Sequence, residues 1–258
     1  MSAPVRHVEA GSGEAIVFLH GVGGDSASWA PQIEAFSGAY RTIAWDMPGY
    51  GGSPALEPMT FAALAGSLAG LLDRLALDRV HLVGHSMGGM VAQEFAAGRP
   101  DRVRTLVLSA TSPAFGRPDG DFQRRFVETR IAPLDNGMTM DDLADEMVET
   151  MLGPDADADG AAIARRSMAG VPEATYRAAI ACLVTFDRRD ALAGYEMPVL
   201  VLAGETDTNA PAPMMEKMAG RIPGADYVCL AGTGHLGNLE NQAAFNRAVG
   251  AFLARRRA

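Results

Sequence analysis

Six short apolar segments recur along the chain, separated by longer stretches of mixed character. They are "AIVFLH", "RTIAWD", "RVHLVG", "RTLVLSA", "PVLVLAG" and "DYVCLAG", at positions 15–20, 41–46, 79–84, 104–110, 198–204 and 226–232. Their near-continuous apolarity, without strict alternation, is typical of strands that are buried on both faces. The pattern therefore predicts a mostly parallel sheet covered by helices, with room for one weak strand ahead of position 15.

The stretch at positions 61–77, "FAALAGSLAGLLDRLAL", shows how the segments between strands support this prediction. Its leucines recur at helical spacing, at Leu64, Leu68, Leu71, Leu72 and Leu75. Right-handed crossovers through such helices connect parallel strands into a doubly wound sheet. The predicted fold class is therefore α/β, with a mostly parallel, doubly wound sheet.

The alternation of strand and helix stops between Ser112 and Asp190. Four helical patterns follow one another there: "DFQRRFVETRI", "TMDDLADEMVETML", "GAAIARRSMAG" and "PEATYRAAIACLVTFD", separated by Pro133, Gly137, Gly153 to Pro154 and Gly170 to Pro172. We interpret residues 113–190 as an all-helical cap over an active site, and residues 1–112 with 191–258 as the core. Such a cap builds a pocket above the carboxyl ends of the strands, where open α/β sheets bind ligands.

Composition narrows the class of protein. The chain has 258 residues, 48% of them hydrophobic and 21% charged, which favours one large core with an insertion over two independent domains. The 22 lysines and arginines against 31 acidic residues give a net charge of −9, which disfavours nucleic acid or anionic lipid as a partner. The expected partner is a small molecule, and the oligomeric state is left open.

The sequence predicts a cytoplasmic location. The first twenty residues, "MSAPVRHVEAGSGEAIVFLH", lack the long apolar centre of a signal peptide, and no window approaches the roughly 18 apolar residues of a membrane span. Two cysteines, Cys182 and Cys229, do not make a disulfide framework. No membrane association is expected.

The candidate nucleophile is Ser86, in "GHSMGG" at positions 84–89. This Gly-x-Ser-x-Gly pattern lies between a predicted strand and the helical "MVAQEFAAGRP", which is the strand-to-helix turn where a nucleophile elbow presents its serine. Small residues around the serine let the chain turn sharply. The alternative interpretation is a glycine-rich turn with an idle serine.

A serine hydroxyl needs a base within hydrogen-bond reach, and an acid that orients the base. The chain has five histidines: His7, His20, His81, His85 and His235. Although His85 adjoins Ser86, adjacent side chains diverge from a tight turn, so a local packing or hydrogen-bonding role is expected for it. The best candidate base is His235, in "LAGTGHLGNLEN", because it follows the last predicted strand at the same edge of the sheet as Ser86.

The acid should also follow a strand at this edge. "LVLAGETDTNAP" supplies Asp207, which stands far enough past the strand for its loop to turn back, with Glu205 as the alternative. The oxyanion that forms during acyl transfer needs two N–H donors. We expect these from the backbone of Met87, at a helix start, and of Val22 in "HGVGG", where the other residues shape the loop.

No cofactor or metal is expected. "HGVGG" fits neither phosphate-binding glycine pattern, and "DADADG" at positions 155–160 imitates the start of a calcium loop but would place Arg166 where the bidentate glutamate belongs. Instead, Asp159 is predicted to cap the helix that follows. Neither cysteine lies at an elbow, and Asp46, in "WDMPGYGGS", is expected to hold its turn by hydrogen bonds.

Two groups of cap residues leave alternatives open. Arg124, Arg125 and Arg130 either hold a substrate carboxylate or are simply solvated or paired with nearby acids. A second set suits either a pocket wall or a helical core: Met87, Phe115, Phe126, Met138 and Met147. Of these, only Met87 is placed beside Ser86 by its motif, and its side chain is expected to form part of the pocket wall.

Five motifs in order resemble the α/β-hydrolase fold superfamily over nearly the whole chain: "HGVGGDSASW", "WDMPGYGGS", "GHSMGG", "GETDTNAP" and "GTGHLGNLEN". The order Ser86, Asp207, His235 is the order of nucleophile, acid and histidine in that superfamily. "TFDRRDAL" at 185–192 and the segment 204–225 are most similar to the 3-oxoadipate enol-lactonase-like branch. The resemblance implies an enzyme that opens a small ester or lactone by acyl transfer to Ser86 and then to water.

Other functions share this arrangement of residues. They are carbon–carbon bond hydrolysis of ring-cleavage products, perhydrolase activity, and a slow-turnover ligand receptor on the same scaffold. Ser86 disfavours the haloalkane dehalogenases and epoxide hydrolases of the superfamily, which carry aspartate at the elbow. At this stage the substrate is open.

Overall fold

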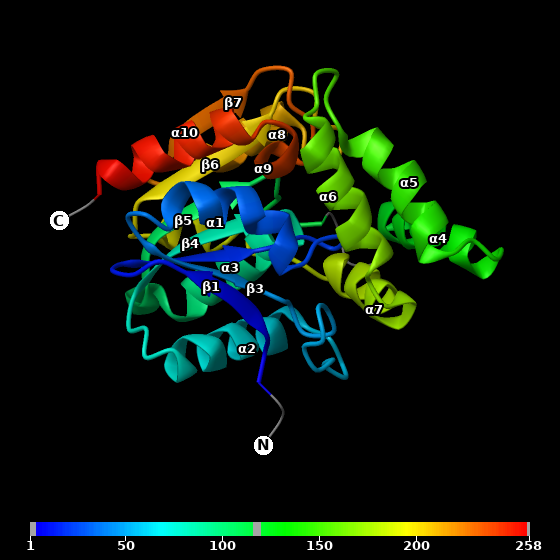
Figure 1. Ribbon diagram of the computed structural model, residues 1–258, viewed down its shortest axis with the longest axis horizontal. Coiled ribbons are helices and arrows are strands. Elements are labelled where there is room, and N and C mark those ends of the chain that lie inside the picture. The colour runs from blue at the N-terminus through cyan, green and yellow to red at the C-terminus, as the bar shows by residue number, and fades with distance from the viewer. Residues whose placement is uncertain (1–3, 116–119, 257–258) are drawn as a thin grey trace.

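A mostly parallel sheet forms the centre of the computed structural model, which describes residues 4–115 and 120–256 (Figure 1). Its strands are β1 (His7–Ala10), β2 (Ala15–Leu19), β3 (Arg41–Trp45), β4 (Val80–His85), β5 (Val103–Ser109), β6 (Val199–Gly204) and β7 (Asp226–Leu230). They lie in the order β1-β3-β2-β4-β5-β6-β7, and only the edge pair β1–β3 is antiparallel. The predicted fold class is confirmed, and β1 is the weak strand expected ahead of the first apolar segment.

Helices cover both faces of the sheet. They are α1 (Ala30–Phe36), α2 (Phe61–Arg74), α3 (Met87–Gly98), α4 (Asp121–Asp135), α5 (Met140–Met151), α6 (Ala158–Ala169), α7 (Glu173–Leu183), α8 (Ala212–Ala219), α9 (Gly237–Glu240) and α10 (Gln242–Ala254), with short 3₁₀ turns at Ser26–Trp29, Pro100–Arg102 and Leu192–Gly194. Side chains of α1 and α10 pack on one face, and those of α2, α3 and α8 pack on the other.

Strand β2 shows why the strand sequences are apolar throughout. Ile16 and Phe18 join the cluster on the α1 and α10 side, whereas Val17 and Leu19 join the cluster on the α2 and α3 side. All four side chains are fully buried. A strand between two helical layers needs an apolar residue at every position, so the alternation of a half-exposed strand is lost.

Along the chain, helices α4 to α7 follow β5 and precede β6, at the four positions that the sequence predicts. In Figure 1 they lie together at the right of the sheet. The two ends of this insertion lie side by side and are joined by backbone hydrogen bonds. A bridge pairs Ala114 with Asp187, and the Phe115 N–H donates to the Phe186 carbonyl oxygen at 2.9 Å. Parts of the ranges predicted for core and cap, residues 1–3, 116–119 and 257–258, lie outside the described residues.

Pro133 does not separate two helices as predicted, because it lies inside α4. Proline inside a helix loses one backbone hydrogen bond and crowds the carbonyl group four residues earlier, and α4 continues for only two residues after Pro133. The chain turns only at Gly137, with φ +94°, where the Met138 N–H donates to the Pro133 carbonyl oxygen at 3.0 Å.

The prediction that Asp159 caps the third helix of the insertion is also wrong. Helix α6 begins at Ala158, and the side chain of Asp157 accepts a hydrogen bond from the Gly160 N–H at 2.7 Å. The Asp157 N–H donates to the Glu240 carbonyl oxygen at 2.9 Å. This long-range contact fixes the residue at which the helix starts, and the local sequence does not reveal it.

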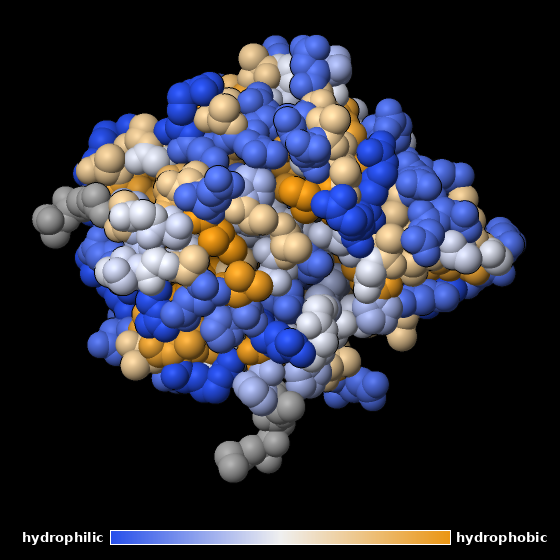
Figure 2. Space-filling model, viewed as in Figure 1, coloured by the Kyte–Doolittle hydropathy of each residue, from blue (hydrophilic) through white to orange (hydrophobic). Residues whose placement is uncertain are grey.

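Polar side chains dominate the face shown in Figure 2, with apolar atoms visible between them. Within the described residues, no helix combines the length and the apolarity that crossing a lipid bilayer requires.

The corrected cap generates a prediction about stability. Asp157→Ala should lower the free energy of unfolding by about 1 kcal/mol, the usual loss for a helix N-cap, because the Gly160 N–H loses its acceptor. Asp159→Ala, in the same first turn, serves as the matched control and should have a smaller effect. Urea denaturation of both variants measures this. An equal or larger loss in Asp159→Ala would contradict the corrected cap.

Candidate active site

Ser86 occupies a strained turn between β4 and α3. Its backbone has φ +52° and ψ −121°, a conformation that residues with side chains rarely adopt. The Ser86 N–H donates to the Ser109 carbonyl oxygen at 2.9 Å, and the hydroxyl of Thr111 donates to the Ser86 carbonyl oxygen at 2.7 Å. These bonds hold the strained conformation and leave the side chain of Ser86 at the surface of a cavity.

Close packing around the turn explains its glycines. A Cβ atom on Gly84 would lie 2.5 Å from the Gly88 carbonyl oxygen, and one on Gly88 would collide with the carbonyl oxygen of Leu19. Helix α3 can therefore begin directly against the ends of β2 and β4 only if both residues lack side chains.

The structure brings together the three residues that the sequence predicts as nucleophile, base and acid. The distance from Ser86 Oγ to His235 Nε2 is 3.1 Å, and the distance from His235 Nδ1 to Asp207 Oδ2 is 2.8 Å. Ser86 follows β4, Asp207 follows β6 and His235 follows β7, so all three lie at the carboxyl edge of the sheet. Both ring nitrogens of His235 are thus engaged, with Asp207 setting the orientation of the ring.

The environment of Asp207 favours its ionised form. Burial opposes ionisation of this carboxyl, but the adjacent His235 and the backbone N–H groups of Ala210 and Asn209 outweigh that effect and lower the pKa of Asp207 below its ordinary value. These two N–H groups donate to Oδ1 at 3.0 and 2.8 Å, which leaves Oδ2 for His235. The side chain of Asp207 has no exposed surface.

His85 has the local role that the sequence predicts. Its Nε2 lies 2.8 Å from the carbonyl oxygen of His235, an acceptor, so this nitrogen carries the proton and donates. Burial, reinforced by the nearby His235, lowers the pKa of His85 to about 3. His85 is therefore a neutral hydrogen-bond donor that supports the backbone of His235.

The "HGVGG" loop lies against Ser86. A Cβ atom on Gly21 would lie 3.0 Å from the Cβ of Ser86, and Val22 lines the same cavity as Ser86. His20 shapes the loop: its Nε2 accepts from the Met47 N–H at 3.0 Å, and its Nδ1 donates to the Gly21 carbonyl oxygen at 2.8 Å. Burial lowers the pKa of His20, which agrees with a neutral ring in this role.

A cavity of about 530 Å³ opens above Ser86 and His235. Most of its lining side chains are apolar. Those from the helical insertion include Phe115, Phe122, Phe126, Met147, Val148, Met151, Met168, Ile180 and Leu183, and Pro211 and Met214, which follow β6, add to the wall. Phe115, Phe126 and Met147, which the sequence left as wall or core, therefore belong to the wall.

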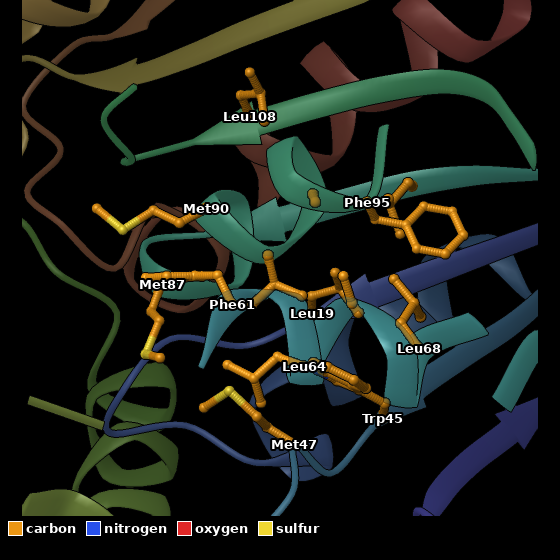
Figure 3. Packing of buried hydrophobic residues seen from close by; sticks show 14 of the residues in the cluster. Leu19, Trp45, Met47, Phe61, Leu64, Leu68, Met87, Met90, Phe95 and Leu108 are labelled. Atoms are coloured by element: carbon orange, nitrogen blue, oxygen red, sulfur yellow. The ribbon is translucent and has the colours of Figure 1, made fainter. Parts of the chain in front are cut away.

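Met87 and Met138 are not among the described residues that line this cavity. The expectation that the Met87 side chain forms part of the pocket wall is wrong, because it is fully buried in the hydrophobic cluster shown in Figure 3. Met87 is the first residue of α3, so its side chain follows the helix into the core while its backbone stays beside Ser86.

Of Arg124, Arg125 and Arg130, only Arg130 lines the cavity. Its guanidinium lies over the ring of Phe126, at 5.2 Å from the ring centroid, and donates to Asn209 Oδ1 at 3.2 Å. Arg124 forms an ion pair with Asp121, and Arg125 donates to the carbonyl oxygen of the same residue.

The remaining candidates have structural partners. Glu205 accepts a hydrogen bond from the Gly232 N–H at 2.7 Å and takes no part in the contact between Asp207 and His235. Asp46 accepts from the Ser26 N–H at 2.7 Å and so connects its turn to the loop after β2. In the described parts of the chain, histidine, cysteine and acidic side chains nowhere gather in groups of three or more that could hold a metal ion.

Sequence reasoning missed Glu240, which lies at the end of α9 and is buried. Its carboxylate accepts hydrogen bonds from the N–H groups of Gly153, Gly234 and Leu236. The available signal was a single acidic residue five positions after His235, in a sequence with no other acidic residue after Asp226.

The buried His85 generates a prediction about pH. The pKa of His85 falls from 6.5 in the unfolded chain to about 3 in the folded protein. Between these values the unfolded chain binds a proton that the folded protein does not bind, so the free energy of unfolding decreases as pH falls from 6.5 toward 3. His85→Gln keeps a side-chain N–H donor without titrating. Urea denaturation between pH 7 and 4.5 should show a shallower loss of stability in His85→Gln, and parallel losses in the two proteins would contradict this assignment.

Comparisons with known proteins agree with this geometry. A model of the alpha/beta hydrolase fold matches residues 14–242. The chain is 32% identical over 251 residues to the protein named "Putative carbamate hydrolase RutD" from Caulobacter sp. (strain K31), covering 93% of this chain and 91% of that one.

A thermophilic esterase from Thermogutta terrifontis superposes with a TM-score of 0.87 at 29% identity, covering 98% and 94% of the two chains. The enol-lactonase from Burkholderia xenovorans LB400 superposes with a TM-score of 0.85 at 27% identity, covering 97% and 96%. The chain therefore belongs to the α/β hydrolase fold family and is an enzyme of that family.

Proposed function

We propose that this enzyme hydrolyses small carboxylic esters or lactones through an acyl-enzyme on Ser86, with His235 as base and Asp207 as the orienting acid. One observation carries the proposal: continuous hydrogen bonds connect Ser86 through His235 to Asp207, and Ser86 lines a mainly apolar cavity. A general base within hydrogen-bond reach is what a serine hydroxyl needs to become a nucleophile.

In the first half of the reaction, Ser86 Oγ attacks the carbonyl carbon while His235 Nε2 accepts the hydroxyl proton. The resulting imidazolium is stabilised by the Asp207 carboxylate, which accepts from Nδ1. As the tetrahedral intermediate collapses, the bond from the carbonyl carbon to the leaving oxygen breaks. His235 then gives its proton to that oxygen, and the acyl group stays on Ser86.

The negative charge on the intermediate needs donors that are already in place. We assign this role to the backbone N–H groups of Val22 and Met87. Met87 directly follows Ser86 and begins α3, and the contact between Gly21 and Ser86 keeps the Val22 loop close to the reacting carbon. Fixed N–H donors of this kind lower the barrier because they need no reorganisation during the reaction.

In the second half, water attacks the acyl carbon and gives a proton to His235 Nε2. The bond to Ser86 Oγ breaks, and the same proton returns to that oxygen. The proposed reaction needs a small-molecule substrate and water, and no cofactor. We assign α4 to α7 (residues 113–190 in the predicted range) the role of a cap, because side chains from these helices line the cavity above Ser86.

The named activities of the two similar structures, an esterase and an enol-lactonase, support this class of substrate. The two cysteines, Cys182 and Cys229, are both free thiols, which agrees with the reducing cytoplasm proposed as the location.

The role of Ser86 can be tested without a known substrate. A fluorophosphonate probe should label the native enzyme, and Ser86→Ala should abolish labelling because the attacking oxygen is removed. His235→Ala should label more slowly than Asp207→Asn, since the first variant removes the base, whereas the second keeps the base and removes the carboxylate that orients it and stabilises its charged form. Gel fluorescence after timed labelling measures all three rates. A folded native protein that never labels, or a His235→Ala variant at the native rate, would refute the proposal.

The guanidinium of Arg130 points to a preference within this class. It lies in the wall of a mainly apolar cavity, held by the ring of Phe126 and by the amide of Asn209. Among residues 4–115 and 120–256, no carboxylate forms an ion pair with Arg130. A substrate that carries a carboxylate would supply that missing partner.

Arg130→Met should therefore lower kcat/KM for a carboxylate-bearing ester by about 10- to 100-fold, the range expected for one lost hydrogen bond to a charged group. The neutral ester of the same length should be much less affected. Arg124→Met, on the same helix but outside the cavity lining, is the matched control. Steady-state rates with esters and lactones of both kinds measure this. Equal losses for charged and neutral substrates would refute the preference.

A further inference from the structure

We propose that Glu240 is a positioning residue that fixes the backbone on both sides of His235 and connects it to the α5–α6 link of the helical insertion. The inference rests on the catalytic role proposed for His235. It assigns a task to a buried carboxylate that takes no direct part in the proposed reaction.

The contacts of Glu240 surround His235. One carboxylate oxygen, Oε1, accepts from the Leu236 N–H at 2.9 Å. The other, Oε2, accepts from the Gly234 N–H at 3.0 Å and from the Gly153 N–H at 2.5 Å. One side chain therefore holds the residues immediately before and after His235, and the same oxygen that holds Gly234 also holds the link between α5 and α6.

The backbone of His235 itself is also fixed at both of its polar groups. Its N–H donates to the Met151 carbonyl oxygen at 2.7 Å, and its carbonyl oxygen accepts from His85 Nε2 at 2.8 Å. Met151 ends α5, and His85 ends β4 directly before Ser86. The histidine is thus connected to the insertion on one side and to the nucleophile turn on the other.

Glu240 is 3% exposed, and no cationic side chain in the described ranges forms an ion pair with it. A buried carboxylate is costly unless hydrogen bonds satisfy it, and here backbone N–H groups supply all the donors. If the side chain of Glu240 served only to fill space, an apolar side chain could do the same. The three donors around His235 instead point to the placement of that loop as the task of the carboxylate.

Glycines allow the insertion to approach so closely. A Cβ atom on Gly234 would collide with the Met151 carbonyl oxygen and would lie 2.8 Å from the Gly153 N atom. The link and the histidine loop therefore touch backbone to backbone, and Glu240 holds both at one oxygen.

A further contact fixes the segment between α5 and α6 against α9. The Asp157 N–H donates to the Glu240 carbonyl oxygen at 2.9 Å, so both the side chain and the backbone of Glu240 hold the segment between α5 and α6. A displacement of this segment would carry His235 with it. Because proton transfer depends on the 3.1 Å distance between Nε2 and Ser86 Oγ, small displacements should reduce catalysis.

The test is Glu240→Gln, which keeps the size of the side chain but replaces one acceptor by an NH₂ group facing N–H donors. We expect kcat for a small acetate ester to fall by about 10- to 100-fold, the cost of a displacement of roughly 1 Å, with a smaller change in KM because Glu240 itself does not line the cavity. The proton NMR resonance of the hydrogen bond between His235 Nδ1 and Asp207 should broaden or disappear. That resonance reports the histidine geometry without any substrate.

Glu205→Gln is the matched control, because Glu205 also accepts one backbone N–H bond from the same loop, at Gly232, away from the residues beside His235. It should keep the native kcat and the native resonance. Thermal unfolding of both variants confirms that they are folded. If Glu240→Gln does not fold, Glu240→Asp takes its place, since the shorter carboxylate cannot reach all three donors and should show the same loss of kcat.

A folded Glu240 variant with native kcat and a native resonance would overturn the inference, as would a loss no larger than that of Glu205→Gln. Failure of the proposed function looks different. In that case native protein shows no turnover that depends on Ser86, while the resonance is still lost in Glu240→Gln.

Discussion

The left-handed backbone of Ser86 is the constraint on which the site depends. Such a conformation costs roughly 1–3 kcal/mol, and the close packing of α3 against the ends of β2 and β4 maintains it. The same packing sends the side chain of Met87 into the core and leaves its N–H beside Ser86. Together, this packing and the strained turn place the Ser86 hydroxyl at the carboxyl edge of the parallel sheet.

The partners of Ser86 come from loops, and the structure fixes those loops by backbone hydrogen bonds. Asp207 is held by two backbone N–H groups, which leave one of its oxygens for the imidazole. The backbone of His235 is held by His85 of the nucleophile turn and by Met151 of the helical insertion, and Glu240 of α9 holds the residues on both sides of it. Because the insertion both lines the cavity and supports the base, changes in its position should alter catalysis as well as substrate binding.

The sequence revealed the sheet because two-sided burial makes each strand apolar at every position, as in β2. It also revealed Ser86 as a candidate, because its motif is local and lies between a strand and a helix. The α6 cap and the contacts of Glu240 could not be predicted in this way. They depend on contacts between residues such as Gly153 and Glu240, which are 87 positions apart, and these exist only once the insertion packs against the histidine loop.

The proposed reaction requires that an acyl group is transferred to Ser86. Its most direct measurement is a rapid acid quench of the enzyme with p-nitrophenyl acetate, followed by peptide mass spectrometry, because acyl-enzymes of this kind accumulate during the first turnover. We expect an acetyl group on the peptide that contains Ser86, formed in step with the release of p-nitrophenol. Turnover without any acetylated peptide, or with the acetyl group on another residue, would contradict it.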